Sequence, residues 1–313
     1  MFNTPEAIDG ESVSIGDIEY LDGRSRLARK ISKLVSLDEI EDATESQIME
    51  TLSPLHMETC ADTRVCVFNV GQGNCVAIAS IPTFPHLYFD FGGGCYGNSS
   101  TYPTGLRFCF SNNPPIVLSH WDKDHWVSGR KHPQAMSMKW IAPRQILGFW
   151  DRKFASDLHN RENLLIWPSS LPSISFPLVI LLKLSGTNHR HNSGLVLIAS
   201  VSGGDVLCPG DAPYSLIPRA ASTNLVGLVA SHHGGKCGRG NPPTPSAGGC
   251  RVVYSFGVPG YGHPSPRSVA KHHRVGWTQR IDTPNGHAAV PSVNPLPMPP
   301  ACGGYCCNLT LQQ

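Results

Sequence analysis

The segment SHWDKDHW, residues 119–126, places four potential metal ligands directly after the apolar run 116–118. They are His120, Asp122, Asp124 and His125. In an extended or loop segment the first three alternate onto one side, and His125 follows on the turn. Imidazole and carboxylate groups together bind zinc, manganese or iron, often with a coordination position left open for water. A solvated surface loop could carry the same residues by chance, so the octapeptide alone leaves both interpretations open.

Three more predicted strand ends carry potential ligands. His191 precedes the run LVLIAS, Asp211 follows DVLCPG, and His232 and His233 follow LVGLVAS. Each residue alone is typical of a cap or a surface position. Histidine or aspartate at four strand ends favours a single metal site assembled by a sheet. The pattern does not distinguish His232 from His233, and His189 is an alternative to His191.

Short β-type runs separated by Gly, Pro and Asn dominate the chain from Arg64 onward. Helical segments are fewer and are expected around 152–163 and 266–274, which favours a layered α/β sandwich over an all-β protein. In the second of these, His272 and His273 accompany basic residues and are expected to be solvated. Two helices are predicted within the first 60 residues, one with Ser36 and Glu39 at capping-box spacing. The sequence shows no internal repeat.

The small net charge of +2 conceals an asymmetry. Residues 1–60 hold 13 acidic and 5 basic side chains, whereas residues 61–313 hold 10 and 20, which gives balances of −8 and +10. A basic main domain favours an anionic substrate, although solvated Lys and Arg side chains are a plainer explanation. The same asymmetry suggests that the acidic segment docks onto a basic cleft within the chain.

Several features indicate a cytoplasmic protein that does not insert into a membrane. No window approaches the roughly 18 apolar residues of a membrane helix, and the N-terminus has no signal-peptide pattern. The eleven cysteines are odd in number, and several lie inside apolar runs, so buried thiols are expected rather than disulfides.

The order HxDxDH, His, GD and HHGG resembles the metallo-β-lactamase fold superfamily, whose first motif is usually HxHxDH. The resemblance covers residues 64–287. More narrowly, the segments VGQGNCVAI, DFGGG, LSHWDKDH, NSGLVL, PGDA, SHHGG and YGHPSP are similar in content and order to the hydrolase domain of ComEC competence proteins. The choline-phosphate esterases of the superfamily share the HxDxDH variant.

This resemblance implies a four-layer αββα sandwich with a short helical N-terminal extension. The corresponding boundaries are an extension at 1–60, a hydrolase domain at 61–290 and a Pro- and Cys-rich tail at 291–313. Two divalent ions are implied, zinc ahead of manganese, although Asp122 in place of the usual histidine makes its site harder and more favourable to manganese. One ion would be held by His120, Asp122 and His191, and the other by Asp124, His125 and either His232 or His233. Asp211 would bridge them, and Asp90 would support the loop.

The implied activity is metal-dependent hydrolysis by a bridging water, of a phosphodiesterase or nuclease-like kind. The expected substrate contains phosphate, with nucleic acid as one candidate. The residues expected to act in catalysis are Asp124, His233 and His263, the last as a substrate contact or general acid. Two alternatives stay open: hydrolysis of a small ester, lactone or thioester, and a non-catalytic, metal-retaining binding or regulatory module.

Overall fold

The computed structural model describes residues 36–53, 55, 63–80, 85–186, 189–219, 223–236, 240–258 and 261–290. The strands are β1 (Thr63–Val67), β2 (Cys75–Ser80), β3 (Pro85–Phe91), β4 (Ile116–Val117), β5 (Trp140–Pro143), β6 (Leu164–Trp167), β7 (Ser173–Ser175), β8 (Val179–Lys183), β9 (Leu195–Val201), β10 (Gly204–Cys208), β11 (Leu225–Val229), β12 (Arg251–Tyr254), β13 (Gln279–Asp282) and β14 (Ala288–Val290). The helices are α2 (Glu45–Thr51), α3 (Ser128–Lys131), α4 (Phe149–His159) and α5 (Pro266–Arg274).

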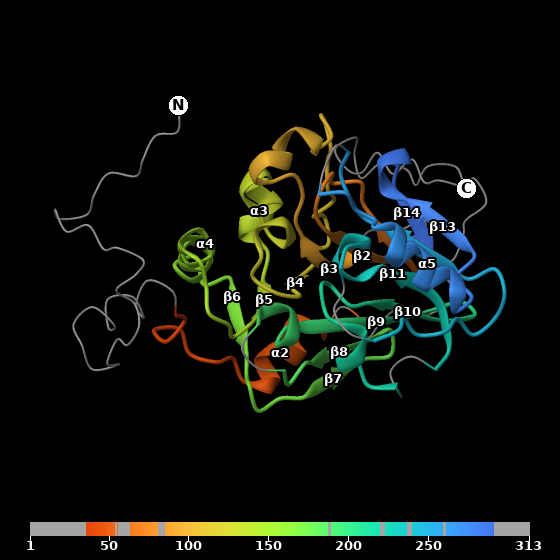
Figure 1. Ribbon diagram of the computed structural model, residues 1–313. Coiled ribbons are helices and arrows are strands. Elements are labelled where there is room, and N and C mark those ends of the chain that lie inside the picture. The colour runs from red at the N-terminus through yellow and green to blue at the C-terminus, as the bar shows by residue number, and fades with distance from the viewer. Residues whose placement is uncertain are drawn as a thin grey trace, which may run out of the picture.

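Two seven-stranded mixed sheets pack face to face, with α4 on the outer surface of the first and α5 on that of the second (Figure 1). Apolar side chains from both sheets form one core between them, to which α2 contributes Ile48. A second core lies between the first sheet and α4, where Phe154 is buried, and a third covers the outer face of the second sheet, with Val269 of α5 packed against it. These layers confirm the predicted αββα sandwich.

The two sheets have the same pattern of strand pairing, which the sequence did not reveal, although the first strand of the first sheet, β14, comes late in the chain. The first has the order β14-β1-β2-β3-β4-β5-β6 and the second β7-β8-β9-β10-β11-β12-β13. In each, the first four strands pair antiparallel and the fourth to seventh pair parallel. Asp90 near the end of β3 therefore corresponds to Asp211 beyond β10, and Ser119-His120 after β4 corresponds to Ser231-His232 after β11. The structure thus contains a repeat of topology without a readable repeat of sequence.

The central strands explain why the sequence shows apolar runs more than strict alternation. β3 is buried at all seven positions and β9 at six of its seven, because both faces of these strands are covered. By contrast, β13 lies at a sheet edge and leaves Gln279 and Arg280 exposed. All six described cysteines are buried thiols, as expected, and no disulfide joins described residues.

Part of the predicted N-terminal extension packs into the sandwich. The capping box of α2 is formed by Thr44 and Gln47, not by the predicted pair Ser36 and Glu39. Residues 36–40 instead form a turn whose apolar side chains Leu37 and Ile40 are buried against the first sheet. Tertiary burial of these residues outweighs the local helix signal. The other helix predicted there, residues 1–35 with their proposed docking role, and the tail 291–313 lie outside the described residues.

His272 in α5 is buried, contrary to the expectation of a solvated residue; His273 beside it is exposed. The His272 Nδ1–H donates to the Ser268 carbonyl at 2.8 Å, and its Nε2 accepts from the Tyr214 hydroxyl at 2.8 Å. That hydroxyl also accepts from the Ser231 backbone N–H at 3.0 Å. Burial lowers the pKa of His272 to about 4, so the ring is neutral at pH 7.

No helix within the described part of the chain is long and apolar enough to cross a membrane.

Replacing His272 with glutamine should flatten the loss of stability in mild acid. Because the folded-state pKa is about 4 and the ordinary value 6.5, the unfolded chain binds more protons between these pH values, and stability falls as the pH falls through that window. Between pH 7 and pH 5 the wild type should lose about 1–2 kcal/mol more unfolding free energy than the variant, measured by urea denaturation. The exposed neighbour His273→Gln is the control and should behave as wild type. Equal pH dependence in wild type and His272→Gln would contradict the burial argument.

Candidate metal centre

Histidine and aspartate side chains from four separate segments meet at one edge of the sandwich. They come from the loop after β4, the turn before β9, the segment after β10 and the turn after β11. They form two adjoining groups of potential ligands: His120, Asp122, His191 and Asp211 in the first, and Asp124, His125 and His233 in the second. The structure therefore brings together seven of the eight predicted ligands in these groups.

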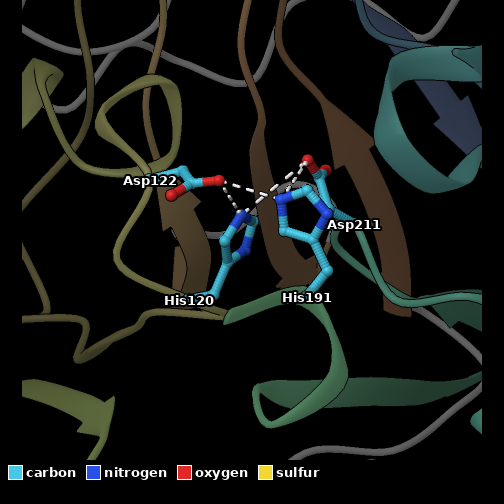
Figure 2. A group of neighbouring side chains, drawn as sticks. All are labelled: His120, Asp122, His191 and Asp211. Carbon is cyan, nitrogen blue, oxygen red and sulfur yellow. Dashed lines mark hydrogen bonds and ion pairs between the residues drawn. The ribbon is translucent and has the colours of Figure 1, made fainter. Parts of the chain in front are cut away.

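The first group is drawn in Figure 2. The Asp122 Oδ2 lies 2.8 Å from His191 Nε2 and 3.3 Å from His120 Nε2. The Asp211 Oδ2 lies 3.6 Å from His191 Nε2 and 3.8 Å from His120 Nε2. Four donor atoms from three segments thus converge on a common point.

The second group adjoins the first through Asp211. The other carboxylate oxygen of Asp211, Oδ1, lies 3.2 Å from His125 Nε2 and 3.8 Å from His233 Nε2. Asp124 Oδ2 lies 3.1 Å from His233 Nε2. Asp211 therefore turns one oxygen toward each group, which is the arrangement expected of a bridging carboxylate.

The geometry separates the two consecutive histidines that the sequence left unresolved. His233 is buried and belongs to the second group. His232 is more exposed; its Nε2 lies 3.7 Å from Asp211 Oδ2, and its Nδ1 is within hydrogen-bonding distance of the Lys236 carbonyl at 3.1 Å. Both residues have positive φ angles, 52° and 56°, so this turn holds two side chains in a conformation that non-glycine residues rarely adopt. His189, the alternative to His191, lies outside both groups.

Hydrogen bonds at Nδ1 orient the three most buried histidines of the site. The Ser119 hydroxyl donates to Asp90 Oδ2, so the His120 Nδ1–H donates to Ser119 Oγ at 2.9 Å. The His125 Nδ1–H donates to Asp90 Oδ2 at 2.8 Å, and the His233 Nδ1–H donates to the Ser255 carbonyl at 2.9 Å. When these rings are neutral, the Nε2 lone pair of each is directed into the site.

Those three Nε2 atoms fit a metal site better than any other role the surroundings offer. They are buried and have no hydrogen-bonding partner among the described residues, and neither has Asp211 Oδ1. Carboxylate oxygens do lie 3.1–3.8 Å away, but without hydrogen-bond geometry. Buried polar atoms are rarely left without partners, and mixed histidine and carboxylate donors are the ligands of zinc and manganese sites.

The electrostatics of the site also favour a cation. Burial lowers the pKa of His125, but the carboxylates of Asp211 and Asp90 outweigh it, so the pKa lies well above its ordinary value. Burial raises the pKa of Asp211, yet His125 and His233 hold it well below its ordinary range. For Asp122, burial likewise raises the pKa, but the neighbouring imidazoles of His120 and His191 bring it far below the ordinary value. The site therefore stabilises ionised carboxylates next to positively charged groups.

Asp90 supports the loop after β4 from beneath, as the resemblance implies. It is fully buried and accepts from the Ser119 backbone N–H at 2.7 Å and from the Asn74 amide at 2.8 Å, besides its bonds from the Ser119 hydroxyl and His125. Gly92, two residues further on, lets the loop approach closely, because a Cβ there would lie 1.6 Å from the Asp124 carbonyl oxygen. Gly92 is thus required by the close packing of the loop.

A pocket of about 280 Å³ opens onto the site. Besides potential ligands it is lined by Gln72, Tyr261 and His263. The Gln72 Nε2 lies 3.4 Å from His263 Nδ1, and its Oε1 accepts from the Gly257 N–H at 3.3 Å. Burial and the neighbouring His233 lower the pKa of His263 to about 4. His263 was predicted to reach the cleft; Gln72 was not, because no sequence pattern gives the direction of its side chain.

Sequence reasoning also missed Arg190, although it directly precedes His191. Its Nη1 donates to Asp122 Oδ1 at 2.9 Å and lies 2.8 Å from Asp151 Oδ2. No sequence pattern links Arg190 to Asp122, which is 68 positions away. Only the folded chain brings the pair together.

No protein-family model matches the sequence, and no curated protein matches it. Among the solved structures that resemble the chain are three whose similarity covers 70% of it. They are Tm1679, described as a metal-dependent hydrolase of the β-lactamase superfamily (13% identity, 95% of its own chain, TM-score 0.40), the metallo-β-lactamase fold protein YhfI from Bacillus subtilis (12%, 95%, 0.40) and Zn²⁺-bound PqqB from Methylobacterium extorquens (11%, 98%, 0.38). Because the TM-scores are below 0.5, these likenesses say nothing about the function of this chain.

Asp211→Asn should reduce bound metal. The amide has one acceptor oxygen and no charge, so it can no longer face both groups with a carboxylate oxygen. We expect elemental mass spectrometry of protein loaded with Zn²⁺ or Mn²⁺ to show a fall from about two ions per chain to one or none. Asp205→Asn is the matched control, because Asp205 lies in β10 and accepts from the Ser200 hydroxyl at 2.8 Å, outside both groups. Undiminished metal in Asp211→Asn would argue against a shared carboxylate.

Proposed function

We propose that this protein is a metal-dependent hydrolase of the metallo-β-lactamase fold superfamily that uses two divalent ions. The observation that carries the proposal is the set of three buried Nε2 atoms, on His120, His125 and His233, that lack hydrogen-bonding partners beside the two-sided carboxylate of Asp211. A structural role would satisfy these atoms within the protein. A decayed site would be expected to lose at least one of the ligand positions.

Each group of side chains would hold one ion. His120, Asp122 and His191 would bind the first, Asp124, His125 and His233 the second, and Asp211 both. Two such ions lower the pKa of a bound water and polarise the phosphoryl or carbonyl oxygen of a substrate. Zinc and manganese both suit these donors, and the carboxylate-rich first group is the more favourable of the two for manganese.

The residues of the pocket that bind no ion in this scheme are suited to contact substrate. The assignment of the Gln72 amide, with Oε1 accepting from Gly257, directs its N–H toward His263 Nδ1. A neutral His263 then carries its proton on Nε2, where it can donate to an oxygen of the substrate or leaving group. His232, half-buried beside Asp211, offers a second contact next to His263, because the two ring centroids lie 5.7 Å apart.

The substrate class that we propose is a phosphodiester, with nucleic acid as one candidate. The +10 balance of residues 61–313 favours an anionic substrate, and the order of motifs resembles the ComEC-type hydrolase domain. Phosphodiester hydrolysis is a reaction for which paired divalent ions are well suited, because they neutralise charge on the transferring group. Docking of the acidic N-terminal segment onto the same cleft remains our prediction.

Hydrolysis of bis-p-nitrophenyl phosphate tests this function directly. Protein loaded with Zn²⁺ or Mn²⁺ should release p-nitrophenolate, and treatment with a chelator should abolish release until metal is restored. p-Nitrophenyl acetate, assayed in parallel, distinguishes the reaction classes. Turnover of the acetate alone would favour a carboxylic ester, lactone or thioester, and bound metal without turnover of either compound would favour the non-catalytic binding module.

His263→Ala should reduce activity without reducing metal content. If His263 donates to an oxygen that gains charge during the reaction, kcat/KM for the diester should fall about 10²-fold, the usual effect of losing one such donor. The metal content of the same preparation, measured by elemental mass spectrometry, should equal that of the wild type. Loss of an ion from His263→Ala would instead identify His263 as a ligand.

A further inference from the structure

Arg190 lies between the first group of potential ligands and the start of α4. Its Nη1 donates to Asp122 Oδ1 at 2.9 Å and to the Trp121 carbonyl at 3.0 Å, and its Nε donates to the Ile146 carbonyl at 2.8 Å. The same guanidinium pairs with Asp151 Oδ2 at 2.8 Å. Arg190 thus connects the loop after β4 with the segment that leads into α4.

The two oxygens of Asp122 have different partners as a result. Oδ1 is held by Arg190, whereas Oδ2 faces His191 Nε2 at 2.8 Å and His120 Nε2 at 3.3 Å. In Figure 2 the dashed lines to Asp122 end on one of its oxygens. A carboxylate can bind a cation through one oxygen or both, and here the second oxygen is already engaged by a cationic donor.

Building on the proposed metal centre, we propose that Arg190 is a positioning residue that makes Asp122 a single-oxygen ligand of the first ion. By retaining Oδ1, the guanidinium leaves only Oδ2 for coordination. Asp122 then offers one donor atom, as a histidine would, and the coordination position that Oδ1 would otherwise occupy stays open for water or substrate. An open position is what distinguishes a catalytic site from a closed structural one.

The surroundings of Arg190 hold it firmly enough for this role. Asp151 is buried and also accepts from the Trp126 indole N–H and the Gly148 backbone N–H, both at 3.0 Å. Gln145 completes the frame: its amide donates to the Arg190 carbonyl at 2.7 Å, and its Oε1 accepts from the Trp121 backbone N–H at 3.2 Å.

These contacts around Arg190 explain why an arginine suits the position. Both the backbone and the side chain of Arg190 are fixed, as are both peptide groups of Trp121, the residue next to Asp122. The planar guanidinium can contact two carboxylates and two carbonyls at once, whereas the ammonium group of lysine is a single point of charge.

Cobalt substitution tests the proposal without requiring turnover. Wild-type protein loaded with Co²⁺ should show the strong visible absorption of four- or five-coordinate cobalt. In Arg190→Met the released Oδ1 should join the coordination shell of the first ion, so the absorption that this ion contributes should fall several-fold while two ions remain bound. Arg190→Lys should retain more of the wild-type absorption than Arg190→Met, because the ammonium still provides one donor for Oδ1.

Two further variants separate this role from a merely structural one. In an Asp122→His background no second oxygen exists, so adding Arg190→Met should leave the spectrum unchanged. Arg130→Met is the matched control, because Arg130 pairs with Asp157 at 2.8 Å away from both ligand groups. If Arg190→Met fails to fold because Asp151 is left as an unpaired buried charge, the double variant Arg190→Met/Asp151→Asn carries the same test.

The outcomes distinguish this inference from the proposed function. An unchanged cobalt spectrum in Arg190→Met at full metal content would overturn the role of Arg190, even if the protein hydrolyses phosphodiesters. A spectrum that changes as expected in a protein that hydrolyses nothing would support the role and overturn the proposed activity. Failure of the wild type to bind Co²⁺, Zn²⁺ or Mn²⁺ would overturn both.

Discussion

The buried carboxylate of Asp90 is the interaction on which the site depends. A full negative charge without solvent contact must be compensated by donors, and Asp90 receives them from Ser119, His125 and Asn74. These bonds join the end of β3 to the loop after β4 and set the tautomer of a potential ligand. Asp90 itself has a φ of 58°, so its backbone is held in an unfavourable conformation by the surrounding contacts. The conformation of the loop after β4 therefore follows from the need to supply hydrogen-bond donors to the Asp90 carboxylate.

The repeated sheet topology explains how separate segments reach a common point. In each sheet a change from antiparallel to parallel pairing occurs at the fourth strand, β3 in one and β10 in the other. The chain leaves both strands toward the same edge of the sandwich, so Asp90 and Asp211 occupy corresponding positions. Their roles nevertheless differ, because Asp90 is saturated by hydrogen bonds whereas Asp211 Oδ1 has no hydrogen-bonding partner among the described residues. Asp90 thus supports the site from beneath, whereas Asp211 lies within it.

The charged groups of the site lie at two distances from the histidines. Asp122, Asp124 and Asp211 lie closest to the histidines, and Arg190 with Asp151 lies outside Asp122. Outer groups of this kind fix the orientation of ligands and change their donor strength, so they affect metal binding without touching the ion. The first group is tied to α4 through such a pair, whereas the second is tied to β12 and its following residue through the Ser255 carbonyl. The two groups are therefore supported by different parts of the fold and need not bind metal alike.

Much of this organisation was readable in the sequence alone. The apolar runs identified the central strands because burial on both faces demands continuous apolar residues, and histidine or aspartate at four predicted strand ends indicated one cluster of donors. Tertiary structure decided the rest. Burial of Leu37 and Ile40 moved the helix start to Glu45, and the left-handed turn after β11 placed His233, not His232, in the second group. The partners of Asp122 were likewise beyond the sequence, because a hydrogen bond between residues 68 positions apart depends on strand pairing and packing, which no local pattern records.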